Sequence, residues 1–322
     1  MVKRKFAHKI AVVAPSVQNS VDESHNSGFL LKETIHEGLK PPTLHEPRKV
    51  RLANRRHTLC VLLIVLLVLF AIVIAGFLLN DSAVQTDFSL KNISPNFEHI
   101  FGTDWMGRDM FSRTVAGLSL SILVGLLAAV SSSIIALVLG SAAALGGKKV
   151  DTVISWLIDL LMGLPHIILL ILISFALGKG FFGVMVGIAV THWASLARVV
   201  RAEILQCRQS DYVAIAQKLG KNPFQIAIKH MMPYVLPQFL VGLVLMFPHA
   251  ILHEAAITFL GFGLPLEQPA IGIILSESMS YLSAGKWWLA VFPGLALVLV
   301  VILFDRVGSS LRRLVDPFTS QD

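Results

Sequence analysis

The sequence predicts an all-α polytopic membrane protein with six transmembrane helices. Of its 322 residues, 55% are hydrophobic and 15% are charged, and the mean hydropathy is +0.72; a soluble domain carries about 25% charged residues. The apolar residues are also gathered in uncharged runs, such as residues 59–79. A run of this length crosses the ~30 Å hydrocarbon layer of a bilayer. A soluble protein with a large buried core would not need six such runs.

The first part of the chain predicts a tail followed by a membrane anchor. Residues 1–58 contain Ser, Asn, Pro, Glu and Lys without a sustained apolar period, which indicates a largely disordered tail; the basic residues described below predict that this tail is cytoplasmic. The run 59–79 begins too far along the chain for a cleavable signal peptide, so it predicts an uncleaved first transmembrane helix. Residues 80–117 then form an extracytoplasmic segment.

The rest of the chain predicts a core domain over 118–308 and a cytoplasmic tail over 309–322. Two separators within the core domain, 146–151 and 178–180, contain glycines that favour tight turns between helices. We expect the five transmembrane helices of this domain at 118–145, 152–177, 181–200, 235–260 and 287–305.

Basic residues predict the orientation, because Lys and Arg prefer the cytoplasmic side of the membrane. Of the 27 Lys and Arg residues, 22 lie on the side of the N-terminal tail, the 146–151 turn, the 198–234 stretch and the C-terminal tail. We therefore expect a multi-pass protein of the plasma membrane with both termini in the cytoplasm. Since the net charge of +7 arises from this asymmetry, binding to nucleic acid is the weaker interpretation. Cys60 and Cys207 give no disulfide framework.

The polar stretch between the fourth and fifth runs predicts two short helices joined by a glycine turn. Apolar residues recur at roughly helical spacing from 212 to 219, and Gly220 is a natural helix terminus. A second helical piece follows and is expected to end or kink near Pro233. Ala214, Ala216 and Gly220 are small and occupy adjacent helical positions, so we expect them to let another surface approach closely.

Several ionisable side chains fall inside the predicted transmembrane helices, where they need partners or line a pathway. His249 and His253 are spaced i,i+4 and are able to share a cation on one helix face, with Glu254 beside them. Imidazole and the thioether of Met246 suit a soft or borderline divalent ion. The alternative is a network of hydrogen bonds that specifies packing or gating. Asp159, His166 and His192 are interpreted mainly as structural groups that pair with neighbouring spans.

The stretch DYVAIAQKLGKNPFQIAIKHMMP (211–233) resembles the EAA loop of ATP-binding-cassette importer permeases. In that family this loop is a coupling helix that docks into a groove on an ATPase subunit. The resemblance implies this role for 211–222. Two positions depart from the general motif, which has Glu where this chain has Ala214 and Ala where it has Ile215. The residues to which the resemblance assigns ATPase coupling are Asp211, Tyr212, Ala214, Ala216, Gly220, His230 and Pro233.

Two further segments resemble the dipeptide/oligopeptide/nickel branch of the same family. They are FGTDWMGRDMFSR (101–113), ahead of the second run, and FLGFGLP (259–265), after the fifth. The segments 191–201 and 249–263 are similar to the nickel-type C subunit. The resemblance covers roughly 95–317 and implies a six-helix type I importer permease that carries nickel or a nickel–chelator complex. A dipeptide or oligopeptide importer is the alternative.

The resemblance also implies the partners: a second homologous permease, two ATP-binding-cassette ATPase subunits and an extracytoplasmic binding protein that meets the 80–117 segment. Residues 146–149 lack the spacing of a phosphate-binding loop. We therefore expect no enzymatic activity and no cofactor on this chain, with ATP and Mg²⁺ bound by the partner subunits. A self-sufficient secondary carrier, with Asp159 and Glu254 as ion sites, is a competing class. A membrane enzyme would need a convergent catalytic site, and none with adequate spacing is present.

Overall fold

The computed structural model describes residues 52–315 and, from residue 55 onward, their side chains. Regular structure in this range is helical apart from a single β-bridge between Thr103 and Asp109. The elements are α2 (Leu52–Leu78), α3 (Asn80–Val84), η1 (Phe88–Leu90), α4 (Met110–Leu145), α5 (Lys148–Gly163), α6 (His166–Ala176), α7 (Gly180–Arg208), α8 (Asp211–Lys218), α9 (Pro223–Ile226), a π-helix (Ala227–Met231), α10 (Met232–Phe259), α11 (Ile271–Leu282) and α12 (Trp288–Val315).

Five of these helical segments are long and apolar enough to cross a membrane, and α5 and α6 together make a sixth if the bent pair is one span. The predicted fold class is confirmed. Helix α2 begins at Leu52 and α12 continues to Val315, so helical structure extends into both predicted tails. Residues 1–51, which carry most of the predicted N-terminal tail, lie outside the described range. The apolar helix α11 was not predicted, because its 12 residues are too few to span a bilayer.

The predicted continuous helix over 152–177 is wrong. The chain instead forms α5 and α6, which meet at an angle of 98°. The break falls at Leu164–Pro165. Leu164 has extended backbone angles (φ −87°, ψ 145°), as a residue before proline prefers. Pro165 has no N–H to donate to the preceding turn, so one helix ends and another begins.

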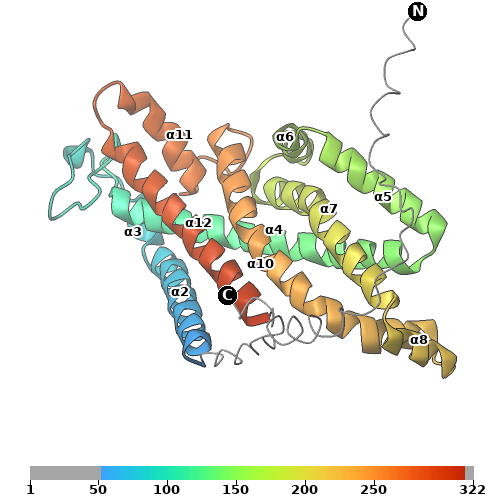
Figure 1. Ribbon diagram of the computed structural model, residues 1–322. Helices are drawn as coiled ribbons and strands as arrows, with labels where there is room; N and C mark the ends of the chain where they lie inside the picture. The colour runs from blue at the N-terminus through green and yellow to red at the C-terminus, as the bar shows by residue number, and fades with distance from the viewer. Residues whose placement is uncertain (1–51, 316–322) are drawn as a thin grey trace, which may run out of the picture. The chain divides into compact units, whose positions relative to one another are not determined.

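Helix α4 is the centre of the helix packing. It runs along α7 and also contacts α2, α10 and α12, and Figure 1 shows it crossing behind α12 and α10. Small residues face inward along it, among them Ala128 and Ala136, and Ala197 of α7 is likewise buried. Small side chains allow helix backbones to approach closely, which is how membrane helices gain packing contacts. By contrast, α2 leaves Leu63, Leu67, Phe70 and Phe77 exposed on its outer face.

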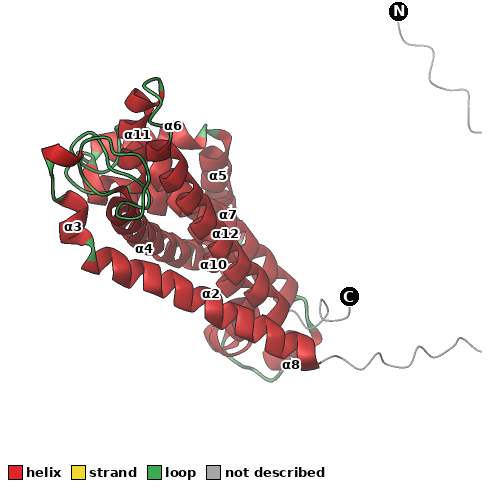
Figure 2. Cartoon of the chain, turned by 90° about the vertical axis from the view of Figure 1, so that its left-hand side faces the viewer, coloured by secondary structure: helices red, strands yellow, loops and turns green. Residues whose placement is uncertain are grey.

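The loops gather at the two ends of the helices. Figure 2 shows the coils near α3 and α11 at one end, and α8 at the other. Because α4 and α10 connect these ends through apolar stretches long enough to cross a membrane, the two loop regions belong to opposite sides of it.

An ion-pair network holds the loop before α4 against α11. The carboxylate of Asp104 accepts hydrogen bonds from Arg113 Nη1 at 2.7 Å and Arg108 Nε at 2.6 Å. Its second oxygen accepts from the backbone N–H groups of Met106 and Arg108. Glu277 of α11 accepts from both arginines. Asp109 caps the N-terminus of α4 by accepting from Ser112 N. The charged side chains of the motif GTDWMGRDMFSR therefore bind one another and Glu277, and they hold the loop before α4 in place.

Replacing Gly107 by alanine is expected to lower the free energy of unfolding by more than about 1 kcal/mol. Gly107 has φ +76°, and an added Cβ would lie 1.7 Å from the carbonyl oxygen of Asp87. Gly147 is the matched control, because it has φ +84° but no atom within 4 Å of an added Cβ. Thermal unfolding in detergent should show a much larger loss for Gly107→Ala than for Gly147→Ala. Equal losses would show that the contact with Asp87 is unimportant.

Candidate functional site

The turn between α8 and α9 is closed by backbone hydrogen bonds that require one residue in the left-handed backbone conformation. Lys221 N donates to Ala216 O and Gly220 N donates to Gln217 O, which is the Schellman pattern of a helix C-terminus. Gly220 has φ +72°, a conformation that glycine adopts without strain. Asn222 then caps α9 by accepting from Phe224 N, and Pro223 follows at its first position. The predicted helix–glycine–helix layout is thus present.

The outer surface of this unit is apolar. Four large side chains on α8, its turn and α9 are exposed, with exposed fractions of 43% for Tyr212, 56% for Ile215, 73% for Leu219 and 70% for Phe224. Tyr212, Ile215 and Leu219 lie between the candidate membrane spans Gly180–Arg208 and Pro223–Phe259, and Phe224 lies at the very start of the second. Lipid tails therefore do not explain the exposure of the first three in the way they explain that of α2. Contiguous apolar surface of this kind marks an interaction site. We call these four residues the apolar face of α8.

One part of the predicted docking surface needs correction. Ala214 is exposed, but Ala216 is 4% exposed and packs inward together with Val213. Ala214, Ala216 and Gly220 therefore do not form a shared outer surface. The reason is helical geometry: positions 213 and 216 share the inner side of α8, as residues three apart do.

The other predicted coupling residues lie around the base of α8. Asp211 is the first residue of α8, where its negative charge interacts favourably with the positive end of the helix dipole. The hydroxyl of Tyr212 lies 2.8 Å from Cys207 Sγ, and desolvation together with this contact raises the pKa of Tyr212. The ring of His230 lies 6.4 Å from that of Tyr212, and its Nε2 is 3.2 Å from Lys221 Nζ.

Helical structure continues through Pro233, so the predicted helix end at this residue is wrong. The chain forms a π-helix over Ala227–Met231 and continues directly into α10. A proline ring clashes with the carbonyl of the preceding turn in a regular α-helix. A π-bulge widens that turn, which explains how helical structure passes through Pro233.

A pocket of about 490 Å³ lies among the membrane-spanning helices. Its wall comes from α5, the break between α5 and α6, and helices α6, α7 and α10. The lining is mostly apolar, with Leu161, Leu196 and Leu245 among its residues, and its polar groups are mainly histidines. Residues on both sides of the break in the third span, Met162 and His166, therefore contribute to its wall. Its lining includes His166, His192, His249 and His253.

Three of these histidines come together from three different helices. His166 of α6, His192 of α7 and His253 of α10 each offer a ring nitrogen within 4.8 Å of the others'. Their ring centroids are 4.5 to 5.0 Å apart. We call these three residues the histidine triad. His249 lies one turn before His253 and lines the same pocket. The sequence singled out all four histidines but gave no means of bringing His166 and His192 to His253.

The two acidic residues predicted inside the membrane have very different surroundings. Glu254 is fully buried, and one of its carboxylate oxygens accepts a hydrogen bond from Thr258 Oγ1 at 2.9 Å. Asp159, in contrast, is an exposed side chain on α5 that accepts from Arg198 Nη2 at 2.8 Å. Neither lines the pocket described above. The sequence did not indicate that Arg198 is the partner of Asp159.

The segment FLGFGLP fixes the turn between α6 and α7. The carbonyl of Phe262 accepts from Ser174 Oγ at 2.7 Å, and that of Gly263 accepts from Gly180 N at 2.9 Å. Lys179 Nζ donates to Gly261 O at 3.1 Å. The motif therefore joins the loop after α10 to the neighbouring helical hairpin, which is a structural role.

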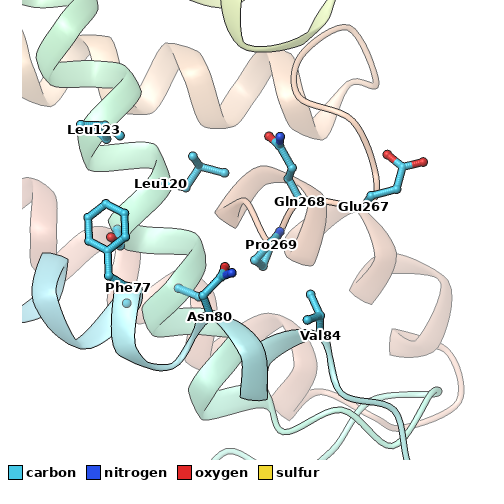
Figure 3. Close-up of a pocket in the computed structure, with 11 residues that line it drawn as sticks. Phe77, Asn80, Val84, Leu120, Leu123, Glu267, Gln268 and Pro269 are labelled. Carbon is cyan, nitrogen blue, oxygen red and sulfur yellow. The ribbon is translucent and has the colours of Figure 1, made fainter.

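A second pocket, of about 310 Å³, lies where α2, α3 and α4 meet the loop before α11. Figure 3 shows Phe77, Asn80 and Val84 along one side of it and Glu267, Gln268 and Pro269 along another. It contains none of the residues that the sequence pointed to.

The long apolar helices, the broken third span and the short exposed helix unit between α7 and α10 define a polytopic helical membrane protein with a surface suited to a partner. Residues 136–321, more than half of the chain, match the family of binding-protein-dependent transport system inner membrane components. The chain belongs to this family and is a multi-pass transport permease.

Individual relatives extend the similarity over most of the chain. A Brucella suis biovar 1 (strain 1330) protein provisionally named as a peptide transport system permease is 36% identical over 83% of this chain and 90% of its own length. The dipeptide transport system permease protein of Bacillus subtilis (strain 168) is 32% identical over 79% of this chain and 80% of its own. The oligopeptide permease protein of the same organism is 32% identical over 82% and 86%.

Solved structures support the fold. A chain of the MetNI methionine ABC transporter, in an inward-facing conformation, superimposes with a TM-score of 0.55 over 64% of this chain and 98% of its own. At 20% identity, this likeness concerns the arrangement of helices. It agrees with the predicted type I importer permease fold.

Proposed function

We propose that this chain is one transmembrane subunit of an ATP-driven importer that takes up dipeptides or oligopeptides with the help of an extracytoplasmic binding protein. The assignment of peptides as cargo rests on the similarity to permeases named for peptide transport, at 32–36% identity over about four fifths of the chain. The pocket of about 490 Å³ lies within the size range of small-ligand pockets, roughly 300–1,000 Å³.

The apolar face of α8 supports the energy-coupling part of the proposal. We propose that this face lies on the cytoplasmic side, where most basic residues gather, and docks into an ATPase subunit. Two ATPase subunits with bound ATP and Mg²⁺, and a second homologous permease, complete the assembly. Each ATPase then drives a change of access through α8, which is joined to α7 and α10 by short connections.

Nickel, or a nickel–chelator complex, is the second candidate cargo. The relatives described above are named for peptides, so they favour the peptide alternative over the nickel prediction. The histidine triad supports nickel as the cargo, because imidazole is a good ligand for this ion.

Uptake measurements test the proposal. Deleting this chain in its host is expected to abolish uptake of a labelled dipeptide at low concentration, and the native gene on a plasmid should restore it. Uptake should stop when the partner ATPase carries an inactive nucleotide site and should persist when the proton gradient is collapsed with ATP maintained. Unchanged peptide uptake after deletion would overturn the peptide assignment, and loss of radioactive nickel uptake instead would support the second candidate. Uptake that depends on the proton gradient alone would favour a secondary carrier.

A further inference from the structure

We propose that the histidine triad is a binding site for a divalent first-row transition-metal ion, such as Ni²⁺, Cu²⁺ or Zn²⁺, on the wall of the membrane pocket. This inference goes beyond the transport of peptides and does not depend on the cargo. It rests on the position of His166, His192 and His253 on three separate helices around one cavity.

The hydrogen bonds around His192 leave a ligand nitrogen free. Its Nδ1 lies 3.1 Å from the carbonyl oxygen of Ile188. A carbonyl only accepts, so Nδ1 carries the proton, and the lone pair of the neutral ring is on Nε2. A carbonyl that binds one ring nitrogen and so orients the other is the usual arrangement behind a metal-binding histidine. Thr191 Oγ1 lies 3.2 Å from the same Nδ1.

Two ring nitrogens of the triad are buried without a partner. The Nε2 atoms of His166 and His192 are both shielded from solvent and have no hydrogen-bond partner among the described residues. An unpaired polar atom in an apolar interior is unfavourable. A metal ion in the centre of the triad would satisfy both atoms at once.

The distances are compatible with a metal site after small rotations of the rings. Zn–N bonds of 2.0–2.1 Å in a tetrahedral site place ligand nitrogens about 3.3 Å apart. The triad nitrogens lie within 4.8 Å of one another, and the rings are inclined by 58° to 76° rather than stacked. Turning the side chains toward the centre brings the nitrogens closer without moving the helices far.

The lining of the pocket selects the type of ion. None of the described residues that line it is acidic, so hard cations such as Mg²⁺ and Ca²⁺ lack the oxygen ligands they prefer. Neutral imidazoles suit borderline ions, and Met246 and His249 in the same wall offer a thioether and a further imidazole. The absence of a neutralising carboxylate predicts reversible binding with open coordination positions. Since the triad joins α6, α7 and α10, a bound ion links three spans and should stabilise the chain against unfolding.

Metal titration of the full-length chain in lipid nanodiscs tests the site. The tail contains His8, His25, His36 and His45, so all four are first replaced by alanine to remove their contribution. We expect one equivalent of Ni²⁺ to bind with nitrogen ligands seen by X-ray absorption, and to raise the melting temperature. His166→Ala, His192→Ala and His253→Ala should each weaken binding at least tenfold and remove the stabilisation. His57→Ala, an exposed position on α2, should change neither.

A second variant tests the site by the appearance of a new absorption band rather than by a loss of metal affinity. In His253→Cys a thiolate replaces an imidazole, so added Co²⁺ should give a thiolate-to-metal charge-transfer band that the unsubstituted chain lacks. Cys60 and Cys207 are replaced by serine in both proteins to remove background. Equal Ni²⁺ affinity in all the alanine variants, or no new band in a folded His253→Cys protein, would overturn the site. Neither result would bear on peptide uptake, which is measured separately.

Discussion

Replacing Asp104 by alanine is expected to lower the free energy of unfolding by about 3–5 kcal/mol, the usual loss when one partner of a buried ion pair is removed. Asp104 and Arg113 each have side chains only 3% exposed. Without Asp104, the guanidinium of Arg113 keeps only Glu277 as an acidic partner, and the backbone N–H groups of Met106 and Arg108 lose their acceptor. The loop before α4 would then detach from α11 more easily.

Thermal unfolding of the purified chain in detergent measures this effect. Asp81→Ala is the control, because Asp81 is an exposed acidic residue on α3, on the same side of the molecule. Replacing Asp104 and Arg113 together by apolar residues of similar size should recover part of the loss, since no buried charge is then left without its partner. If Asp104→Ala melts at the same temperature as Asp81→Ala, the network does not stabilise the fold.

Most spans were predictable from the sequence because the thickness of the bilayer sets the length of an apolar run. The run 59–79 shows this, since α2 covers all of it but the last residue and begins seven residues earlier, at Leu52. The break in the third span was marked by Pro165, but its apolar neighbours on both sides favoured a continuous helix. Helix α11 was not predictable from length, because it is stabilised by packing against α10 and α12 rather than by crossing the bilayer.

The candidate sites were only partly predictable, because long-range contacts complete them. The helix–glycine–helix unit is local, and its turn residues are within one short stretch of the sequence. The histidine triad, in contrast, joins positions on α6, α7 and α10, and the i,i+4 pattern identified only His249 and His253. In the same way, nothing near Asp104 in the sequence indicates Glu277, which lies more than 160 residues later in the chain.

Replacing Leu219 by aspartate is expected to reduce ATP-driven uptake at least tenfold while leaving the stability of the isolated chain nearly unchanged. Leu219 is 73% exposed at the end of α8, so the charge remains in water when the chain is alone. In the proposed assembly the apolar face of α8 is buried against an ATPase subunit. A carboxylate there would lose its hydration without gaining a partner, and central apolar contacts of an interface contribute about 2 kcal/mol or more when removed.

The test compares three variants by labelled-peptide uptake in cells, co-purification with the ATPase subunit, and melting temperature of the isolated chain. Leu219→Met keeps an apolar side chain of similar volume and should retain uptake. Gly220→Ala changes the adjacent turn, where φ is +72° with no atom within 4 Å of an added Cβ, so it separates strain in the turn from loss of contact. Leu219→Asp should lose both uptake and co-purification although it melts like the native chain. Leu219 lies outside the candidate membrane spans, so contact with lipid does not explain its exposure. Native-like uptake and co-purification in Leu219→Asp would therefore mean that the ATPase binds another surface.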